Sequence, residues 1–398
     1  MKVCSLGGSG EDGRSCFLVN DGERSFLLDC GVRRELSSVD RVYPLLTEEI
    51  AKSLDFVFLS HCHEDHSAAL PYLVQLGFRG KVYCSPETME STPAFMKKWT
   101  KYVISSGKEL PFDINNIERL EFSPIPLGKV NIEGIEAETG RSGHVLGGLW
   151  IMFHLSDGTL LYTGDTTGES LLLERDPFPS ADVLICDAAY GDRVISQDES
   201  YSSILDFARE VLGRGGRILF PVPSNGRGID IALYLGSHGI PLSTDTAVIK
   251  SAQRLSGKKE WLKESSLWNS LDKLCDKGSG FDGALVLPDG MMTTEKIILL
   301  FESMKAEELN ALAVTGHAAE STAACEVMKK EWREKNGVRL ESRRITVKVH
   351  PDRNDVKAIC LTVKPGRVIL FHSRRENCTS LVRELVEKGF SVTCGLLE

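Results

Sequence analysis

The stretch HCHEDH at residues 61–66 constrains this chain more than any other, because four of its six residues can bind a metal ion. An apolar run at residues 56–59 precedes it, and a helix-like run at residues 68–76 follows it. This order predicts a strand, a tight turn and a helix. His61 and His63 are two residues apart, so in an extended segment they face the same way. Asp65 and His66 then approach from the far side of the turn.

That geometry suits two neighbouring divalent ions better than one. Imidazole and carboxylate ligands favour zinc, with manganese or iron as alternatives. A chance surface cluster of histidines is the competing interpretation. It is the weaker one, because the whole chain has nine histidines and three of them lie in this stretch.

The composition is typical of a globular protein with reduced thiols. The chain has 398 residues, 42% of them hydrophobic, which is enough for one large domain or two ordinary ones. Its 11 cysteines include no C-x-x-C pair, and its first ten residues lack the features of a signal peptide. No apolar run approaches the roughly 18 residues that span a bilayer. We therefore predict a cytoplasmic protein without membrane association, in which Cys62 packs inside the turn and is not a ligand.

The net charge of −9 is a weak argument against a nucleic-acid partner. Proteins that bind nucleic acids usually carry a basic surface. Bound metal ions bring their own positive charge, however, and a basic groove can be local. The charge alone therefore does not exclude RNA or DNA as a substrate.

Three further candidate ligands lie outside the histidine-rich stretch. His144 stands in the glycine-rich run GHVLGG, Asp165 ends the run TGD after an expected strand, and His372 follows the apolar run ILF. Asp165 could bridge two ions. A single histidine is more often structural than functional, so each of these residues is a weak signal when taken alone.

Together and in this order, the motifs resemble the metallo-β-lactamase superfamily, and more closely its β-CASP branch of nucleic-acid-cleaving enzymes, which includes ribonuclease J and the cleavage-and-polyadenylation endonuclease. The matching runs include LGGSGEDGRSCFLV, LLDCG with Asp29, HCHEDH, GHVLGG and TGD. Marks of the branch follow in VLICD with Asp187, in YGDR, in GGRILFPVPSNGRG, in VHPDRNDVKA with His350 and in ILFHS with His372. A histidine at the last of these positions is characteristic of the members that act on RNA.

The resemblance implies a fold and a division into domains. The fold is an α/β metallo-β-lactamase αββα sandwich with an inserted α/β domain, the β-CASP domain. We expect the first part of the metallo-β-lactamase domain at residues 1–198, the inserted domain at 199–345 and the second part at 346–398. From about residue 199 the sequence itself alternates between strand-like and helix-like segments.

The resemblance also assigns roles. His61, His63 and His144 are implied to hold one ion, Asp65, His66 and His372 the other, and Asp165 to bridge them. Asp65, Asp187 and His350 form the implied catalytic set. His350 is the general acid that protonates the leaving 3′-oxygen, and Asp187 orients it. Asp29 would orient metal ligands from behind, with a turn-capping aspartate as the alternative.

Four residues are candidates for contacts with substrate phosphates. Arg227 and His317 each precede an expected helix at the end of a strand, where a helix N-terminus can bind phosphate. Lys348 and Arg374 flank the implied catalytic histidines. For Arg227 and His317, the alternative is a role in packing a tight turn.

We therefore predict a binuclear metallohydrolase, a ribonuclease that cuts single-stranded RNA into products with 5′-phosphate and 3′-hydroxyl ends. A hydrolase of a small phosphodiester, lactone or thioester on the same fold is the alternative. A non-catalytic scaffold is a third, which the complete set of seven ligand candidates disfavours. The sequence leaves open endonuclease or 5′-exonuclease action, and also a homodimer.

Overall fold

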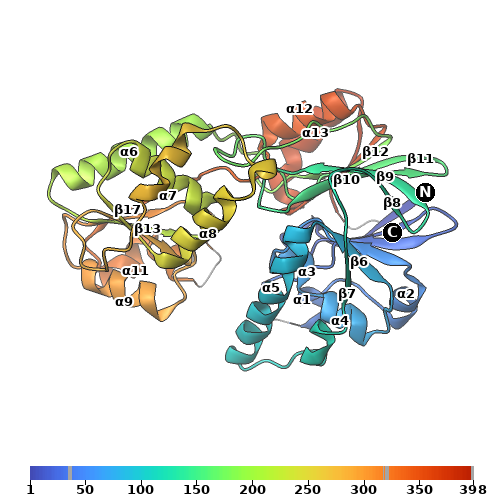
Figure 1. Cartoon of the computed structure of the whole chain (residues 1–398), viewed down its shortest axis with the longest axis horizontal. Helices are drawn as coiled ribbons and strands as arrows, with labels where there is room; N and C mark the ends of the chain where they lie inside the picture. The colour runs from blue at the N-terminus through green and yellow to red at the C-terminus, as the bar shows by residue number, and fades with distance from the viewer. Residues whose placement is uncertain (35–37, 317, 319–321, 396–398) are drawn as a thin grey trace. The chain divides into compact units, whose positions relative to one another are not determined.

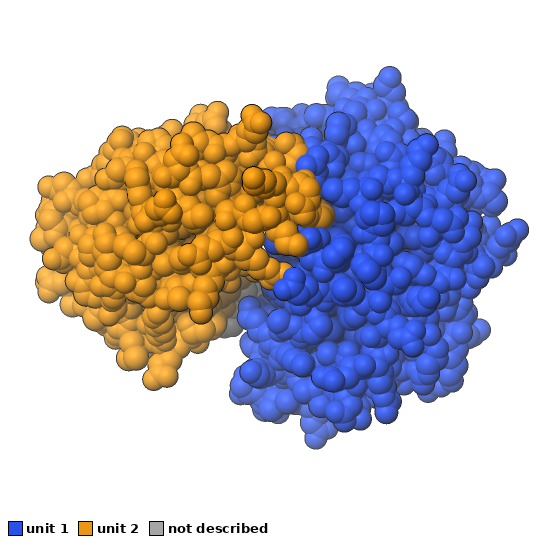
Figure 2. Space-filling view, in the orientation of Figure 1, with its two compact units in different colours: residues 1–168, 175–194, 350–398 blue, residues 169–174, 195–349 orange. Residues whose placement is uncertain are grey.

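The computed structural model describes residues 1–34, 38–316, 318 and 322–395, which form two compact units. Unit 1 comprises residues 1–168, 175–194 and 350–398, and unit 2 comprises residues 169–174 and 195–349 (Figure 2). The chain therefore leaves unit 1 for unit 2 and later returns to unit 1. Residues 169–174 belong to unit 2, whereas we expected them in the first part of the metallo-β-lactamase domain.

Unit 1 contains two large sheets. The first has the strand order β1-β3-β4-β5-β6-β7, and it is antiparallel from β1 to β4 and parallel from β4 to β7. Its strands are β1 (Lys2–Gly7), β3 (Cys16–Asn20), β4 (Ser25–Leu28), β5 (Phe56–Phe58), β6 (Lys81–Cys84) and β7 (Glu121–Pro124).

The second sheet has the order β20-β18-β12-β11-β10-β9-β8. Strands β20, β18, β12 and β11 are parallel, and β10 joins β11 through a hairpin at Asp157-Gly158. Its strands are β8 (Gly128–Ile132), β9 (Ile135–Arg141), β10 (Leu149–Leu155), β11 (Gly158–Tyr162), β12 (Val183–Asp187), β18 (Arg367–Phe371) and β20 (Ser391–Thr393). The short strands β2 (Ser9–Gly10) and β19 (Ser373–Arg374) pair with each other.

Alternating side chains build the layers of unit 1. Inward-facing aromatic rings join the two sheets: Phe26 lies 4.8 Å from Phe153, and Phe17 lies 5.9 Å from Tyr162 and 5.7 Å from Phe371, measured between ring centroids. The residues between them face helices on the outer sides. Helices α3, α4 and α5 lie beside the first sheet, and α12 and α13 beside the second (Figure 1). The αββα sandwich is confirmed.

The helices of unit 1 are short apart from one. They are α1 (Val39–Val42), α2 (Glu48–Ser53), α3 (Glu64–Ser67), α4 (Leu70–Gln75), α5 (Pro86–Ser105), α12 (Arg353–Val363) and α13 (Thr379–Glu387), with 3-10 turns η1 (Ile114–Ile117) and η4 (Arg375–Cys378). None of the helices that the structure describes, in either unit, is long and apolar enough to cross a membrane.

Five predicted site residues follow the carboxyl ends of parallel strands in this sandwich. Asp29 comes directly after β4, His61 shortly after β5, Asp165 shortly after β11 and His372 directly after β18, while Asp187 is the last residue of β12. Parallel neighbours end at the same edge of their sheet, which is where functional groups of α/β folds gather. The topology therefore brings together residues that lie more than 340 positions apart in the sequence.

Unit 2 is built around a five-stranded parallel sheet with the order β14-β15-β13-β16-β17. Its strands are β13 (Ile218–Val222), β14 (Leu242–Thr244), β15 (Ala284–Pro288), β16 (Ala311–Val314) and β17 (Glu341–Arg344). Its helices are α6 (Gln197–Gly213), α7 (Arg227–Ser237), α8 (Thr246–Ser256), α9 (Glu295–Met304), α10 (Ala323–Glu326) and α11 (Lys330–Lys335), with 3-10 turns η2 (Lys259–Trp261) and η3 (Ser266–Lys273). The predicted α/β alternation is confirmed.

A buried carboxyl group in unit 2 gives a prediction on stability. Burial raises the pKa of Asp230 from its ordinary value of 3.8 to about 7, against the opposing effects of Leu171 N–H, Tyr201, Lys263 and Ser170. Because the folded-state pKa is the higher one, the stabilisation is complete below pH 4 and is lost as the pH rises through 7. We expect Asp230→Asn to become more stable relative to the wild type over that range, by a few kcal/mol. Urea unfolding of both proteins from pH 4 to 8 measures this difference, and a constant difference would contradict the assignment.

Candidate metal centre

Two of the predicted ligands come from the turn that follows β5. Leu59 N–H still bonds to the carbonyl of Tyr83 in the neighbouring strand, and the chain then leaves the sheet. His63 occupies the N-cap position of the short helix α3, which begins at Glu64 within the histidine-rich stretch. The helix-like run predicted at residues 68–76 forms the next helix, α4. The rings of His61 and His63 lie 4.7 Å apart, on the same side of the turn as predicted.

His144 lies in a loop whose glycines allow it to pack closely against the start of α5. Gly147 has φ +85°, and its carbonyl accepts hydrogen bonds from Ser85 Oγ at 2.7 Å and Thr88 Oγ1 at 2.9 Å. A β-carbon on Gly147 would come within 2.7 Å of the Glu87 side chain, so a larger residue does not fit. This loop holds the His144 ring 5.1 Å from that of His63.

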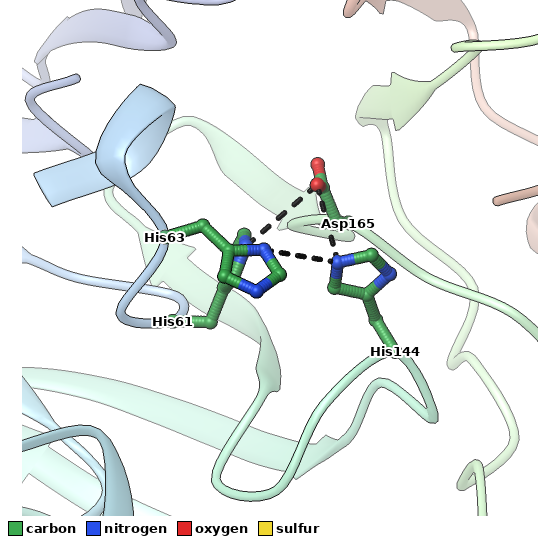
Figure 3. A group of neighbouring side chains, drawn as sticks. All are labelled: His61, His63, His144 and Asp165. Carbon is green, nitrogen blue, oxygen red and sulfur yellow. Dashed lines mark hydrogen bonds and ion pairs between the residues drawn. The ribbon is translucent and has the colours of Figure 1, made fainter. Parts of the chain in front are cut away.

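The first group of ligands consists of His61, His63, His144 and Asp165, whose candidate ligand atoms all lie within 4.8 Å of one another. Figure 3 shows the three imidazoles and the carboxylate turned toward one another. Asp165 Oδ2 lies 3.7 Å from His61 Nε2 and 3.6 Å from His144 Nε2. His144 Nε2 lies 3.3 Å from His63 Nδ1.

The second group consists of Asp65, His66, Asp165 and His372. His66 Nε2 lies 3.1 Å from Asp165 Oδ1, and His372 Nε2 lies 3.0 Å from Asp65 Oδ2 and 3.6 Å from Asp165 Oδ2. His372 has a φ of +68°, an uncommon conformation for histidine, and its N–H bonds to the carbonyl of Gly8. Asp165 belongs to both groups, which is the position of a bridging ligand.

Burial and neighbouring charges shift the pKa values of the residues in both ligand groups. Burial lowers the pKa of His61 and His63, which keeps both imidazoles neutral, the form that binds metals. Burial alone would also lower the pKa of His372, but the neighbouring carboxylates of Asp165 and Asp65 outweigh it and raise the value to about 10. Burial alone would raise the pKa of Asp65 and Asp165, but His66 and His372 outweigh it and lower the pKa of both carboxylates.

Two buried atoms show that the site fits a metal. Among the described residues, His61 Nε2 has no hydrogen-bond partner, and Asp165 Oδ1 has only the ion pair with His66 Nε2 given above, although His61 and Asp165 are at most 2% exposed. A buried polar atom without a partner costs about 1–3 kcal/mol. Coordination to a cation would satisfy both atoms, and a set of five imidazoles with two carboxylates suits divalent ions. The site therefore fits divalent metal ions.

A third group joins Asp187 and His350 to Asp165. His350 Nδ1 lies 2.9 Å from Asp187 Oδ2 and 3.8 Å from Asp165 Oδ2. Asp187 is fixed in turn, because its carboxylate accepts from the N–H groups of Thr166 and Ala189. In this geometry the Asp187 carboxylate can orient the His350 imidazole.

The YGDR run that follows Asp187 also has a structural role, which the sequence alone did not indicate. Gly191 approaches the carbonyl of Asn377 so closely that a β-carbon would lie 2.2 Å from it. The Asp192 carboxylate accepts from Ser380 and Leu381 N–H at the start of α13. The run therefore links the strand that carries Asp187 to the segment that follows His372.

The four candidate substrate contacts differ in their surroundings. Arg374 is half exposed and pairs with Asp12 at 2.7 Å in unit 1. Arg227 begins α7 in unit 2, and its guanidinium packs against Gly316. Lys348, also in unit 2, is 3% exposed and forms an ion pair with Glu169. His317 lies outside the described residues.

Sequence reasoning missed two residues behind the ligands, Ser60 and Tyr162. Ser60 Oγ and Tyr162 Oη lie 2.7 and 2.5 Å from Asp29 Oδ2, and His66 Nδ1 lies 2.6 Å from the same oxygen. The only signal in the sequence is position: Ser60 immediately precedes His61, and Tyr162 immediately precedes the TGD run.

Comparison with known proteins places these features in a family. The family model described as "Metallo-beta-lactamase superfamily" matches residues 9–190. The chain is 26% identical to the "Transcription termination factor FttA" of Methanocaldococcus jannaschii, covering 100% of this chain and 71% of that protein. It is 26% identical to the "Probable RNase MJ4" of the same organism, covering 98% and 97%. It is 23% identical to "Integrator complex subunit 11" of Danio rerio, covering 99% and 72%.

The chain spans 66–71% of the length of three termination factors that it matches over most of its own length. A solved structure, a protein of unknown function from Enterococcus faecalis, superimposes with a TM-score of 0.62 at 14% identity, covering 98% of this chain and 96% of that one. This likeness supports the fold alone. The family match, the relatives and the metal-binding geometry together show that the chain carries a metallo-β-lactamase superfamily domain within residues 9–190, and that nearly its whole length is similar to the three named relatives.

Proposed function

We propose that this protein is a metal-dependent ribonuclease that hydrolyses phosphodiester bonds of single-stranded RNA to give 5′-phosphate and 3′-hydroxyl ends. The observation that carries the proposal is the pair of ligand groups that share Asp165, with Asp187 and His350 directly beside it. A relative of nearly equal length, 26% identical, bears the name of a probable ribonuclease. In this proposal unit 2 is the β-CASP domain, and the substrate-contact roles of Arg227, His317, Lys348 and Arg374 remain predictions.

The proposed site holds two divalent ions. His61, His63 and His144 would hold one, Asp65, His66 and His372 the other, and Asp165 both. Zinc suits these nitrogen and oxygen ligands best, and manganese is the alternative. Two bound ions would supply Lewis-acid activation of water and would stabilise negative charge on the phosphate.

The protein's own groups supply the proton. Asp187 accepts from His350 Nδ1, which fixes the ring and leaves Nε2 to carry the proton that is transferred. His350 is 14% exposed, so a substrate can reach it, whereas Asp187 is fully buried. We propose that His350 Nε2 protonates the leaving 3′-oxygen, so that this oxygen leaves as a hydroxyl group and not as an alkoxide.

The test is cleavage of single-stranded RNA labelled either internally or at the 5′ end. The protein is first stripped with a chelator and then supplied with zinc or manganese. We expect no cleavage by the stripped protein, restored cleavage with metal, and products with 5′-phosphate and 3′-hydroxyl ends. Discrete internal fragments would identify an endonuclease, and direct release of mononucleotides an exonuclease.

The same protein should be offered a small phosphodiester, a lactone and a thioester. A metal-loaded protein that cleaves one of these but leaves RNA intact under both metals would contradict the proposal and favour the small-substrate alternative.

A further inference from the structure

One buried hydrogen-bond network stands behind both ligand groups, and its centre is Asp29. This residue is 0% exposed and has a φ of +59°, a conformation that aspartate tolerates better than most residues. Ser60 N–H donates to Oδ1 at 2.6 Å. Ser60 Oγ at 2.7 Å, Tyr162 Oη at 2.5 Å and His66 Nδ1 at 2.6 Å donate to Oδ2. Four donors thus converge on one carboxylate that never meets solvent.

Ser60 extends the network to a second metal ligand. Its Oγ lies 3.1 Å from His61 Nδ1. A hydroxyl group has one hydrogen, and Ser60 donates it to Asp29, so it must accept from His61 Nδ1–H. His66 donates its own Nδ1–H to Asp29 directly. Both imidazoles are thereby held with Nδ1 protonated, which leaves the lone pair of Nε2 for a metal.

The Nε2 atoms of His61 and His66 belong to different groups of metal ligands. His61 Nε2 lies 3.7 Å from Asp165 Oδ2 in the first group, and His66 Nε2 lies 3.1 Å from Asp165 Oδ1 in the second. One carboxylate therefore sets the ligating nitrogen of one histidine in each group, directly for His66 and through Ser60 for His61.

Tyr162 brings the second sheet into the network. Asp29 and Ser60 follow β4 and β5 of the first sheet, whereas Tyr162 is the last residue of β11 in the second. Asp165 follows Tyr162 by three residues. The backbone at Gly164 packs closely against Ser60, since a β-carbon on Gly164 would lie 2.8 Å from the β-carbon of Ser60. The bond from Tyr162 to Asp29 therefore fixes the bridging Asp165 relative to the histidines on the opposite sheet.

We propose that Ser60 and Tyr162 are positioning residues that act through Asp29 on both metal groups and couple the binding of the two ions. The inference rests on the proposed metal site and does not depend on the proposed RNA substrate. Burial and the Asp29 carboxylate raise the pKa of Tyr162, which keeps the phenol in its donating form.

The test measures metal binding by Tyr162→Phe and Ser60→Ala without RNA. Zinc affinity is determined by competition with a chromophoric chelator, and the number of bound ions by native mass spectrometry. We expect Tyr162→Phe to weaken both sites by about 10- to 100-fold, the range typical of groups that orient metal ligands. Ser60→Ala should weaken the site of His61 most. Cobalt spectra should show altered coordination in both variants.

A matched control comes from unit 2. Tyr201 is also buried, and its hydroxyl lies 3.5 Å from a buried carboxylate, that of Asp230. Tyr201→Phe should bind metal like the wild type. Wild-type affinity in Tyr162→Phe, or an equal loss in Tyr201→Phe, would overturn the inference. If the wild type binds two ions but cuts no RNA, the proposed function fails while this inference stands.

Discussion

Replacing His350 with alanine is expected to reduce RNA cleavage by about 10²- to 10⁴-fold, the usual contribution of a general acid, while two metal ions remain bound. The reason is that His350 is paired with Asp187 at 2.9 Å and belongs to neither of the two groups that we propose to hold metal. Single-turnover cleavage of labelled RNA gives the rate, and native mass spectrometry of the same preparation gives the number of bound ions.

A substrate with a better leaving group tests the role of the acid directly. In RNA with sulfur in place of the 3′-bridging oxygen, the leaving thiolate needs no proton, so His350→Ala should recover most of the lost rate on that substrate. His154→Ala is the matched control, because His154 is exposed on β10 of the same unit. Cleavage of ordinary RNA by His350→Ala at the wild-type rate would show that another group is the acid.

Much of the fold was predictable because its signals are local. The strand, turn and helix around HCHEDH follow from an apolar run, a ligand-rich turn and a second apolar run. The hairpin at Asp157-Gly158 follows from its turn residues. The order of the motifs along the chain then indicated that Asp165 and His372 would join the histidines. In the structure, Asp165 and His372 lie close together because β11 and β18, the strands before them, run parallel in the second sheet and end at the same edge of it.

What the sequence could not show depends on contacts between distant segments. Tyr162 meets Asp29 across the two sheets, 133 positions away. Residues 169–174 join unit 2 through Asp230 and through Lys263, whose ammonium bonds to the carbonyl of Ser170. Neither contact leaves a periodic signal in the sequence.

The sequence also predicts a long helix at residues 320–335, of which the structure describes residues 322–335, and this prediction is wrong for a related reason. The structure has two short helices instead, α10 and α11, separated at residues 327–329. No residue of α11 is buried. In α11, packing against the core, which stabilises most helices in proteins, is therefore limited to the partly buried Trp332.

Replacing Asp165 with asparagine is expected to have the largest effect on metal binding of any single change at this site. The side chain keeps its size but loses the negative charge that both ligand groups share, at 3.7 Å from His61, 3.1 Å from His66 and 3.6 Å from His372. We expect both ions to be lost together at micromolar metal, and RNA cleavage to fall by more than the roughly 100-fold typical of changes outside the ligand shell. Metal analysis after gel filtration and single-turnover cleavage measure the two effects.

The number of ions lost distinguishes a bridging residue from an ordinary ligand. His63→Ala, in the first group only, should lose one ion and keep the other, whereas Asp165→Asn should lose both. Asp182→Asn is the matched control, because Asp182 accepts from Thr159 N–H at the opposite end of the same strands and should leave both ions bound. Two tightly bound ions in Asp165→Asn would mean that the groups do not depend on a shared carboxylate. Loss of one ion only would place Asp165 in a single group, and a neighbouring residue would then have to hold the two ions together.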